Sequence, residues 1–157
     1  MPNSHKLNIV LVAPEIPGNT GSIGRTCVAL RSRLILIHPL GFDLSEKAVR
    51  RAGLDYWKHV EIAEYPDFSS FLNQEKPSQN QMKFFSKAGR QSLFETKIEK
   101  GDFLIFGSET KGLPRDILEE FADSTVNLPM YSEEIRSLNL SNVATAAAYE
   151  GIRQIDF

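Results

Sequence analysis

Short apolar runs recur along the whole chain, and they constrain its fold more than any other feature of the sequence. Several are almost continuously hydrophobic, which is typical of β-strands that are covered on both faces. We therefore predict a sheet of six strands buried between two layers. The runs are Leu7 to Ala13, Arg33 to Pro39, Val60 to Tyr65, Met82 to Ser86, Asp102 to Ser108 and Ser124 to Met130.

The segments between these runs are amphipathic or begin with capping residues, and we predict that they are helices. They are Thr20 to Leu30, Ser45 to Ala52, Asp67 to Glu75, Arg115 to Phe121 and Asn142 to Gln154. Regular alternation of strand and helix predicts an α/β fold with a parallel sheet. A length of 157 residues with 41% hydrophobic residues fits one domain over residues 1–157.

Several classes of protein do not fit this composition. Cys27 is the single cysteine, and the three histidines at positions 5, 38 and 59 lack the spacing of metal ligands. We therefore expect no metal site. The first apolar run is too short for a signal peptide or a membrane span, so we expect a cytoplasmic protein with no membrane segment.

Charge is distributed unevenly along the chain, although the formal net charge is only −2. Residues 1–60 carry eight Lys/Arg against four Asp/Glu, whereas residues 61–157 carry ten against sixteen. A basic N-terminal third could face a polyanion such as RNA. An uneven but merely solvated surface explains the same pattern equally well.

The loop after the first predicted strand, "PEIPGNTGSIGRT", brings glycines and Asn19 to the start of a helix. Glycines there allow the backbone to approach a ligand closely. Their spacing, G-x-x-G-x-x-G, differs from the G-x-G-x-x-G of dinucleotide-binding folds and argues against NAD. Arg25 could reach a phosphate or carboxylate from this helix, or could be a surface arginine paired with an acid.

The loop "LIFGSETKGLP", Leu104 to Pro114, follows a buried strand. Gly107 and Gly112 have the separation found in a phosphate loop, but Leu113 and Pro114 replace the required Lys and Ser/Thr. Glu109 could hold a hydroxyl or amine of a ligand, or could cap the turn.

The third loop opens the stretch "RSLNLSNVATAAAYE", Arg136 to Glu150. Ser137, Asn139, Ser141 and Asn142 are more polar groups than one helix cap requires. In open parallel sheets, ligands bind beyond the carboxyl ends of the strands. Three such loops therefore predict one crevice for a neutral or zwitterionic small molecule.

The stretches "NTGSIGRT", "FGSETKGLP" and "SLNLSNVATAAAYE" resemble, in order and spacing, the three motifs of the SPOUT class of RNA methyltransferases. "PEIPGNTG", "HPLGF", "RRAGLDYW" and "YEGIRQ" are similar to its small stand-alone branch, which methylates the wobble nucleotide of leucine tRNAs. The resemblance extends from Leu7 to Gln154. It implies a six-stranded sheet with a C-terminal deep trefoil knot, bound S-adenosylmethionine, a tRNA substrate and a homodimer.

The resemblance also implies roles for individual residues. The functional positions of the family correspond to Asn19, Arg25, Glu109, Ser137 and Asn139, and its cofactor contacts to Phe85, Gly107, Leu128 and Ser137. RNA contacts are expected at Arg25, Lys47, Arg50 and Arg51, with Tyr56 and Trp57 able to stack on bases or to pack in the protein. The segment "MYSEEIRSLN" is one residue longer than the branch pattern.

The implied reaction is attack of a ribose 2′-hydroxyl on the methyl group of the cofactor. The family assigns the base to Arg25, but a guanidinium with a pKa above about 12 accepts protons poorly. Our hypothesis is that Arg25 mainly holds a substrate phosphate, with proton acceptance left open. Alternatives are methylation at another tRNA or rRNA position, a non-catalytic RNA-binding relative, and an NAD-dependent oxidoreductase.

Overall fold

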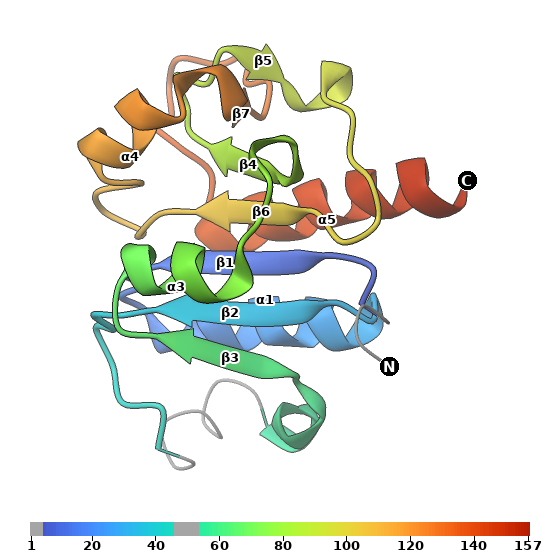
Figure 1. The fold of residues 1–157 in the computed structure, drawn as a ribbon. Coiled ribbons are helices and arrows are strands. Elements are labelled where there is room, and N and C mark those ends of the chain that lie inside the picture. Colours follow the sequence, from blue (N-terminus) through green and yellow to red (C-terminus); the bar gives the residue numbers. More distant parts are fainter. Residues whose placement is uncertain (1–4, 46–53) are drawn as a thin grey trace.

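The computed structural model describes residues 5–45 and 54–157, which form a parallel sheet between two layers of helices (Figure 1). The strand order is β3-β2-β1-β6-β4-β7-β5. The strands are β1 Asn8–Val12, β2 Arg33–Ile37, β3 Ile62–Tyr65, β4 Met82–Phe85, β5 Gln91–Ser92, β6 Phe103–Phe106 and β7 Thr125–Asn127. All pairings between neighbouring strands are parallel, which confirms the predicted class of sheet.

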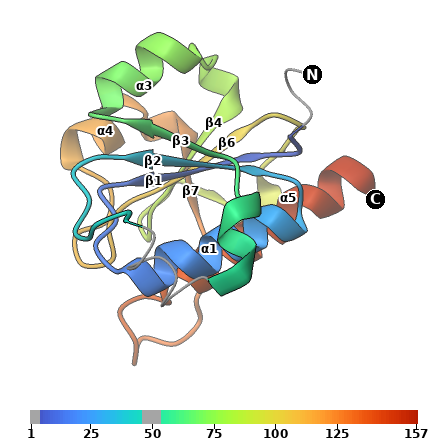
Figure 2. The same cartoon turned by 90° about the horizontal axis from the view of Figure 1, so that it is seen from below.

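The helices cover both faces of the sheet, as Figure 2 shows most clearly: α1 and α5 lie on one face, and α3 and α4 lie on the other. Their bounds are α1 Pro17–Ala29, α3 Phe68–Glu75, α4 Arg115–Glu120 and α5 Leu140–Asp156. Short 3₁₀ turns lie at η1 Leu54–His59, η2 Gln79–Gln81, η3 Leu93–Glu95 and η4 Ala122–Ser124.

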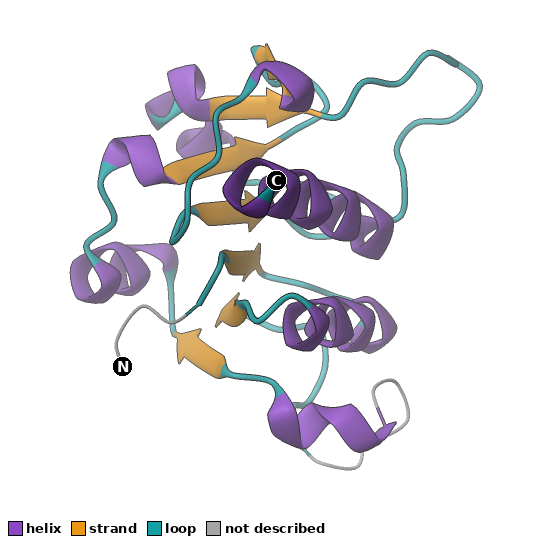
Figure 3. Cartoon of the chain, turned by 90° about the vertical axis from the view of Figure 1, so that its right-hand side faces the viewer, coloured by secondary structure: helices purple, strands orange, loops and turns teal. Residues whose placement is uncertain are grey.

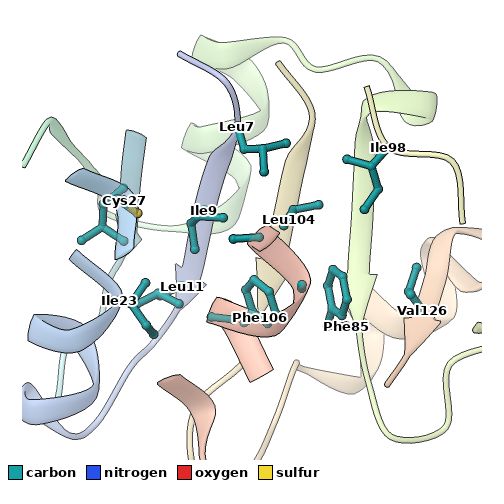
Figure 4. Packing of buried hydrophobic residues seen from close by; sticks show 14 of the residues in the cluster. Leu7, Ile9, Leu11, Ile23, Cys27, Phe85, Ile98, Leu104, Phe106 and Val126 are labelled. Atoms are coloured by element: carbon teal, nitrogen blue, oxygen red, sulfur yellow. The ribbon is translucent and has the colours of Figure 1, made fainter. Parts of the chain in front are cut away.

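Alternate residues of each central strand enter separate hydrophobic cores. In β1, Ile9 and Leu11 pack in the core beneath α1 and α5 (Figure 4), whereas Val10 and Val12 pack in the core beneath α3 and α4. Successive side chains of a strand point to opposite faces, so burial on both faces requires an unbroken apolar run. This is the physical reason for the runs that dominate the sequence.

Two details differ from the predicted elements. The described chain has seven strands rather than six, because Gln91–Ser92 pairs with Val126 and Asn127 of β7. Two polar residues carry no hydrophobic pattern, so β5 could not be recognised in the sequence. The predicted helix Ser45 to Ala52 falls on positions that, beyond Ser45, lie outside the described residues.

At the N-terminal edge of the strands, buried charges are paired with one another. Lys83 Nζ lies 2.6 Å from Asp102 Oδ2, and both side chains are buried. Arg33 donates to Glu75 at 2.6 Å and to the side chain of Asn8 at 2.9 Å. This end of the sheet therefore leaves little charge unsatisfied.

The C-terminal edge instead carries the loops that contain the sequence motifs. The loop between β7 and α5 is the longest of them, and residues 131–139 are all exposed. Figures 2 and 3 show that this loop projects beyond the layer formed by α1 and α5. Among the described helices, none is long and apolar enough to cross a membrane.

Candidate functional site

A cavity of about 630 Å³ opens where β4, β6 and β7 end. Its walls come from the residues after β4, from the loop after β6 and from the loop between β7 and α5. This volume lies within the usual range of small-molecule sites, about 300–1,000 Å³. The position agrees with the predicted crevice at the carboxyl ends of parallel strands.

The predicted cofactor contacts Phe85, Gly107, Leu128 and Ser137 all line this cavity. Phe85 is the last residue of β4, and its ring stacks on Phe106 with centroids 4.6 Å apart. Aromatic and aliphatic side chains thus form one wall, while main-chain and hydroxyl groups form another. Such a mixture suits a ligand with a flat apolar part and a polar part.

Gly107 is required by the close approach of two chain segments. A Cβ atom at this position would overlap the backbone of Gly112 and Leu113. The turn is closed by paired backbone hydrogen bonds between Ser108 and Gly112, and Gly112 has a positive φ of 68°. The loop after β6 therefore folds back on itself at the cavity because both glycines lack side chains.

Glu109 connects this loop to the start of α1. Its carboxylate accepts hydrogen bonds from the backbone N–H of Glu15 at 2.8 Å and of Ile16 at 2.9 Å, and from Asn19 Nδ2 at 3.1 Å. A carboxylate at a helix N-terminus satisfies donors that have no partner within the helix. The structure thus brings Asn19 and Glu109 together, with Glu109 holding the protein's own backbone.

Glu15 makes the reciprocal contact. Its carboxylate accepts from the backbone N–H of Thr110 at 2.9 Å and from the Thr110 hydroxyl at 2.7 Å. These hydrogen bonds lower the pKa of Glu15 from its usual value of 4.5. We refer to the paired contacts of Glu15 and Glu109 as the loop clasp.

Arg25 lies on the exposed side of α1, and it is not among the residues that line the cavity. Its Cζ atom is 5.4 Å from the ring centroid of Tyr56, a distance at which a guanidinium and an aromatic ring attract each other. The Tyr56 hydroxyl donates to the carbonyl oxygen of Gly21 at 2.8 Å. Burial raises the pKa of Tyr56, although Arg25 opposes the shift.

Trp57 packs against α1 rather than standing free, because a Cβ at Gly24 would meet its ring at 2.6 Å. This contact supports the packing interpretation of Trp57 over stacking on a base. Together, Tyr56 and Trp57 fix the turn η1 against the helix that carries Arg25.

The polar residues before α5 divide into two roles. Asn139 is the N-cap, since its side chain accepts a hydrogen bond from the backbone N–H of Ser141 at 2.9 Å. Ser137 lies two residues earlier and lines the cavity. The cap therefore fixes the point at which the helix begins and the loop with Ser137 ends.

Some predicted residues lie elsewhere. Lys47, Arg50 and Arg51 are outside the described residues. Within residues 5–45 and 54–157, no group of three or more His, Cys, Asp or Glu side chains could hold a metal ion. Cys27 is buried, and burial raises its pKa to about 12, so its thiol is not a nucleophile.

The structure also brings residues to the site that the sequence did not single out. Glu15 completes the loop clasp, and Lys87, Lys111 and Arg136 line the cavity. No short motif marks these side chains, because each is placed by the fold of a different loop.

Comparisons with known proteins agree with this site. The model of the SpoU rRNA Methylase family matches residues 6–149. Among curated relatives, a tRNA (cytidine(34)-2'-O)-methyltransferase of Burkholderia ambifaria is 44% identical, with 96% of each chain covered. The enzyme of the same name from Saccharophagus degradans is also 44% identical, with 96% of each chain covered.

Solved structures give the same result. A structure from work on the 2-OH methylation of C/U34 on tRNA has a TM-score of 0.87 and 44% identity, covering 96% of each chain. The SpoU methyltransferase AviRb from Streptomyces viridochromogenes, in complex with the cofactor AdoMet, has a TM-score of 0.81 and 26% identity, covering 98% of this chain and 59% of AviRb. These matches confirm the resemblance seen in the three motifs, and the chain belongs to the SpoU rRNA Methylase family.

Proposed function

We propose that this protein transfers a methyl group from S-adenosylmethionine to the ribose 2′-hydroxyl of the wobble nucleotide of tRNA, with leucine tRNAs as its substrates. Relatives that are 44% identical over 96% of their length carry the name tRNA (cytidine(34)-2'-O)-methyltransferase. The observation that carries the proposal is that all four cofactor contacts expected from the motifs line one cavity.

The cavity fits the cofactor by its size and its lining. Phe85 and Leu128 offer apolar surface, and Gly107 lets the backbone approach a ligand without obstruction. S-adenosylmethionine supplies an electrophilic methyl group on a positively charged sulfur. The residues of the chain must then hold the ribose against that methyl group, and such alignment can supply much of the rate.

Within this proposal, Arg25 orients the RNA by binding a phosphate next to the reacting ribose. Tyr56 supports the guanidinium from one side, and no described carboxylate forms an ion pair with it. An Arg25→Lys variant keeps the charge but loses the bidentate fork. We expect methyl transfer to fall while cofactor affinity stays constant; full turnover would contradict the orienting role.

Glu109 and Asn19 act as positioning residues. The carboxylate of Glu109 is occupied by three N–H donors, so it holds the start of α1 beside the cavity loop. Ser137 lies at the cavity, and Asn139 fixes the helix start behind it. Each motif residue thus has a defined contact from which its role follows.

We further propose that the segment before α5 is threaded to form a trefoil knot, and that two copies form a homodimer. The loops after β6 and after β7 line the same cavity, as a knotted arrangement requires. Tyr149 on α5 and Ile16 beside α1 expose 55% and 47% of their surface, and the two helices are joined by a hydrogen bond between Thr26 and Thr145 at 2.8 Å. A second copy would cover these exposed apolar groups.

The direct test has two steps. Calorimetric titration with S-adenosylmethionine and S-adenosylhomocysteine, with NAD as the control, should show binding of the first two only. Incubation with a leucine tRNA and mass spectrometry should then locate a 2′-O-methyl group at the wobble nucleotide. Methylation elsewhere would favour another tRNA or rRNA position, and cofactor-independent RNA binding would favour a non-catalytic relative.

A further inference from the structure

Three basic side chains surround the cavity. Lys87 follows β4, Lys111 lies in the loop after β6, and Arg136 lies in the loop between β7 and α5. All three are exposed. They come from three separate segments that the sheet brings together at its C-terminal edge. We refer to Lys87, Lys111 and Arg136 as the basic rim.

The basic rim lacks acidic partners in the part of the chain that the structure describes. Other cations, such as Lys6, Arg90 and Arg153, lie within 4 Å of a carboxylate, but none of the three rim residues does. Glu109 also lines the cavity, yet its carboxylate is already engaged by backbone and amide N–H groups of the α1 start. The cavity entrance therefore carries a surplus of positive charge.

The cofactor does not account for this charge. S-adenosylmethionine carries a sulfonium and an ammonium against one carboxylate, so it is itself a net cation. A positive rim opposes its binding and favours an anionic partner at the entrance. The anionic groups that must lie near a reacting ribose are the phosphates on either side of it in the RNA backbone.

We propose that Lys87, Lys111 and Arg136 bind the RNA backbone phosphates that flank the methylated nucleotide. The inference rests on the proposed function and specifies how the substrate is held at the same cavity. Lys and Arg are the usual phosphate ligands in protein–RNA contacts. The rim lies in residues 61–157, which carry ten Lys/Arg against sixteen Asp/Glu, so the net charge of that part conceals it.

The test combines Lys87→Gln, Lys111→Gln and Arg136→Gln in one variant and measures affinity for a leucine tRNA transcript at several salt concentrations. Each lost phosphate contact should reduce the slope of log affinity against log salt by about 0.9, so we expect a decrease of roughly 2 to 3. Affinity at about 0.1 M salt should fall on the order of 100-fold. Affinity for S-adenosylhomocysteine should stay within about twofold, because the cofactor does not use the rim.

Lys100→Gln is the matched control. Lys100 is also exposed and precedes β6, so it lies at the opposite end of the strand from the cavity loop. It should change neither the salt slope nor tRNA affinity. The single rim variants provide a second measurement, since each replaces one exposed side chain and should reduce the slope by about 0.9.

Two results would overturn the proposal: an unchanged salt slope in the triple variant, or a loss of S-adenosylhomocysteine affinity that parallels the loss of tRNA affinity. Failure of the proposed function has a different signature, which is wild-type protein that binds tRNA and S-adenosylhomocysteine but forms no 2′-O-methyl group.

Discussion

The two ends of strand β4 treat a lysine in opposite ways. Lys83, near the N-terminal end, is buried and lies 2.6 Å from the carboxylate of Asp102. Lys87, just beyond the C-terminal end, is exposed at the cavity and has no carboxylate partner among the described residues. Four positions of one chain segment separate a charge that is satisfied by the protein from one that is available to a ligand.

This contrast extends along both edges of the sheet. The N-terminal edge pairs Arg33 with Glu75, and Glu75 also accepts a hydrogen bond from Tyr65, whose pKa rises to about 12 through burial and this carboxylate. A buried charge must be paired because desolvation is costly. An exposed charge at a binding site has no such requirement, so stability and ligand binding separate onto opposite ends of the strands.

Replacing each of these lysines by Met would test the contrast most directly. Lys83→Met leaves Asp102 buried without its cation, and we expect a loss of about 3–5 kcal/mol in the free energy of unfolding. Lys87→Met should stay within about 0.5 kcal/mol, since its side chain is exposed. Urea unfolding at a fixed protein concentration measures both, and similar values for the two variants would contradict the separation.

A control for ion pairing in general is Lys97→Met. Lys97 lies 3.1 Å from Glu99, but the two side chains expose 84% and 65% of their surface. Exposed pairs contribute little, about 0–1 kcal/mol. A large effect here would mean that pairing itself, rather than burial, determines the cost at Lys83.

Gly107→Ala should damage the C-terminal edge through its backbone. The added Cβ would overlap the chain at Gly112 and Leu113, and forced repacking of this kind costs about 1–3 kcal/mol. Because the displaced turn lines the cavity, we expect a loss of S-adenosylhomocysteine affinity of about tenfold or more. Calorimetric titration measures this effect.

Gly18→Ala serves as the control for Gly107. It adds the same methyl group in the first turn of α1, where no atom lies within 4 Å of the new Cβ. Stability should change by less than about 1 kcal/mol, with an increase expected from the higher helix propensity of Ala. Equal losses of cofactor affinity in both variants would show that the turn at Gly107 does not shape the cavity.

Much of this architecture could be predicted from the sequence, because burial on both faces leaves a local signal. The runs that contain β1, β2 and β6 are almost continuously apolar, and each forms a central strand. Strand β5 left no signal, since Gln91 and Ser92 are held there only by pairing with β7. Its recognition requires knowledge of where a distant segment ends.

The site could be predicted in part for a similar reason. Gly107 and Ser137 belong to short motifs whose residue order survives in the sequence, and both line the cavity. Glu15 and Arg136 were not singled out, because their roles depend on contacts with loops far away in the chain. Local patterns predict which loops matter, whereas the contacts between loops appear only in the folded molecule.

Tyr56 offers a test of how Arg25 is held. Tyr56→Leu removes both the ring beside Arg25 and the hydrogen bond to Gly21, and Tyr56→Phe removes only the hydrogen bond. A cation–π contact of about 0.5–1 kcal/mol and a hydrogen bond of about 1 kcal/mol predict a loss in kcat of roughly tenfold for Leu and about fivefold for Phe.

A purely structural role for Tyr56 would give a different result. Stability would then fall in both variants while kcat per folded molecule stayed constant. We expect S-adenosylhomocysteine affinity to be unchanged, since neither Tyr56 nor Arg25 lines the cavity. Steady-state methyl transfer, normalised to the folded fraction, distinguishes the two interpretations.

The smallest expected effect concerns the loop clasp and its dependence on pH. Hydrogen bonds from Thr110 lower the pKa of Glu15 below its usual value of 4.5, so the charged form is favoured in the folded state. The resulting stability is present above pH 4.5 and is lost as the pH falls through the lowered pKa. Glu15→Gln should therefore show a shallower loss of stability on acidification than the wild-type protein.

Urea midpoints measured between about pH 6 and pH 3 would reveal this difference. Asp67, Glu75 and Glu150 also have lowered pKa values, but they contribute equally to both proteins, so the difference isolates Glu15. The same acid dependence in both proteins would mean that Glu15 does not hold Thr110 in solution. Glu109 would then be the sole carboxylate that joins the cavity loop to α1, and the comparison between the two edges would narrow to the basic rim.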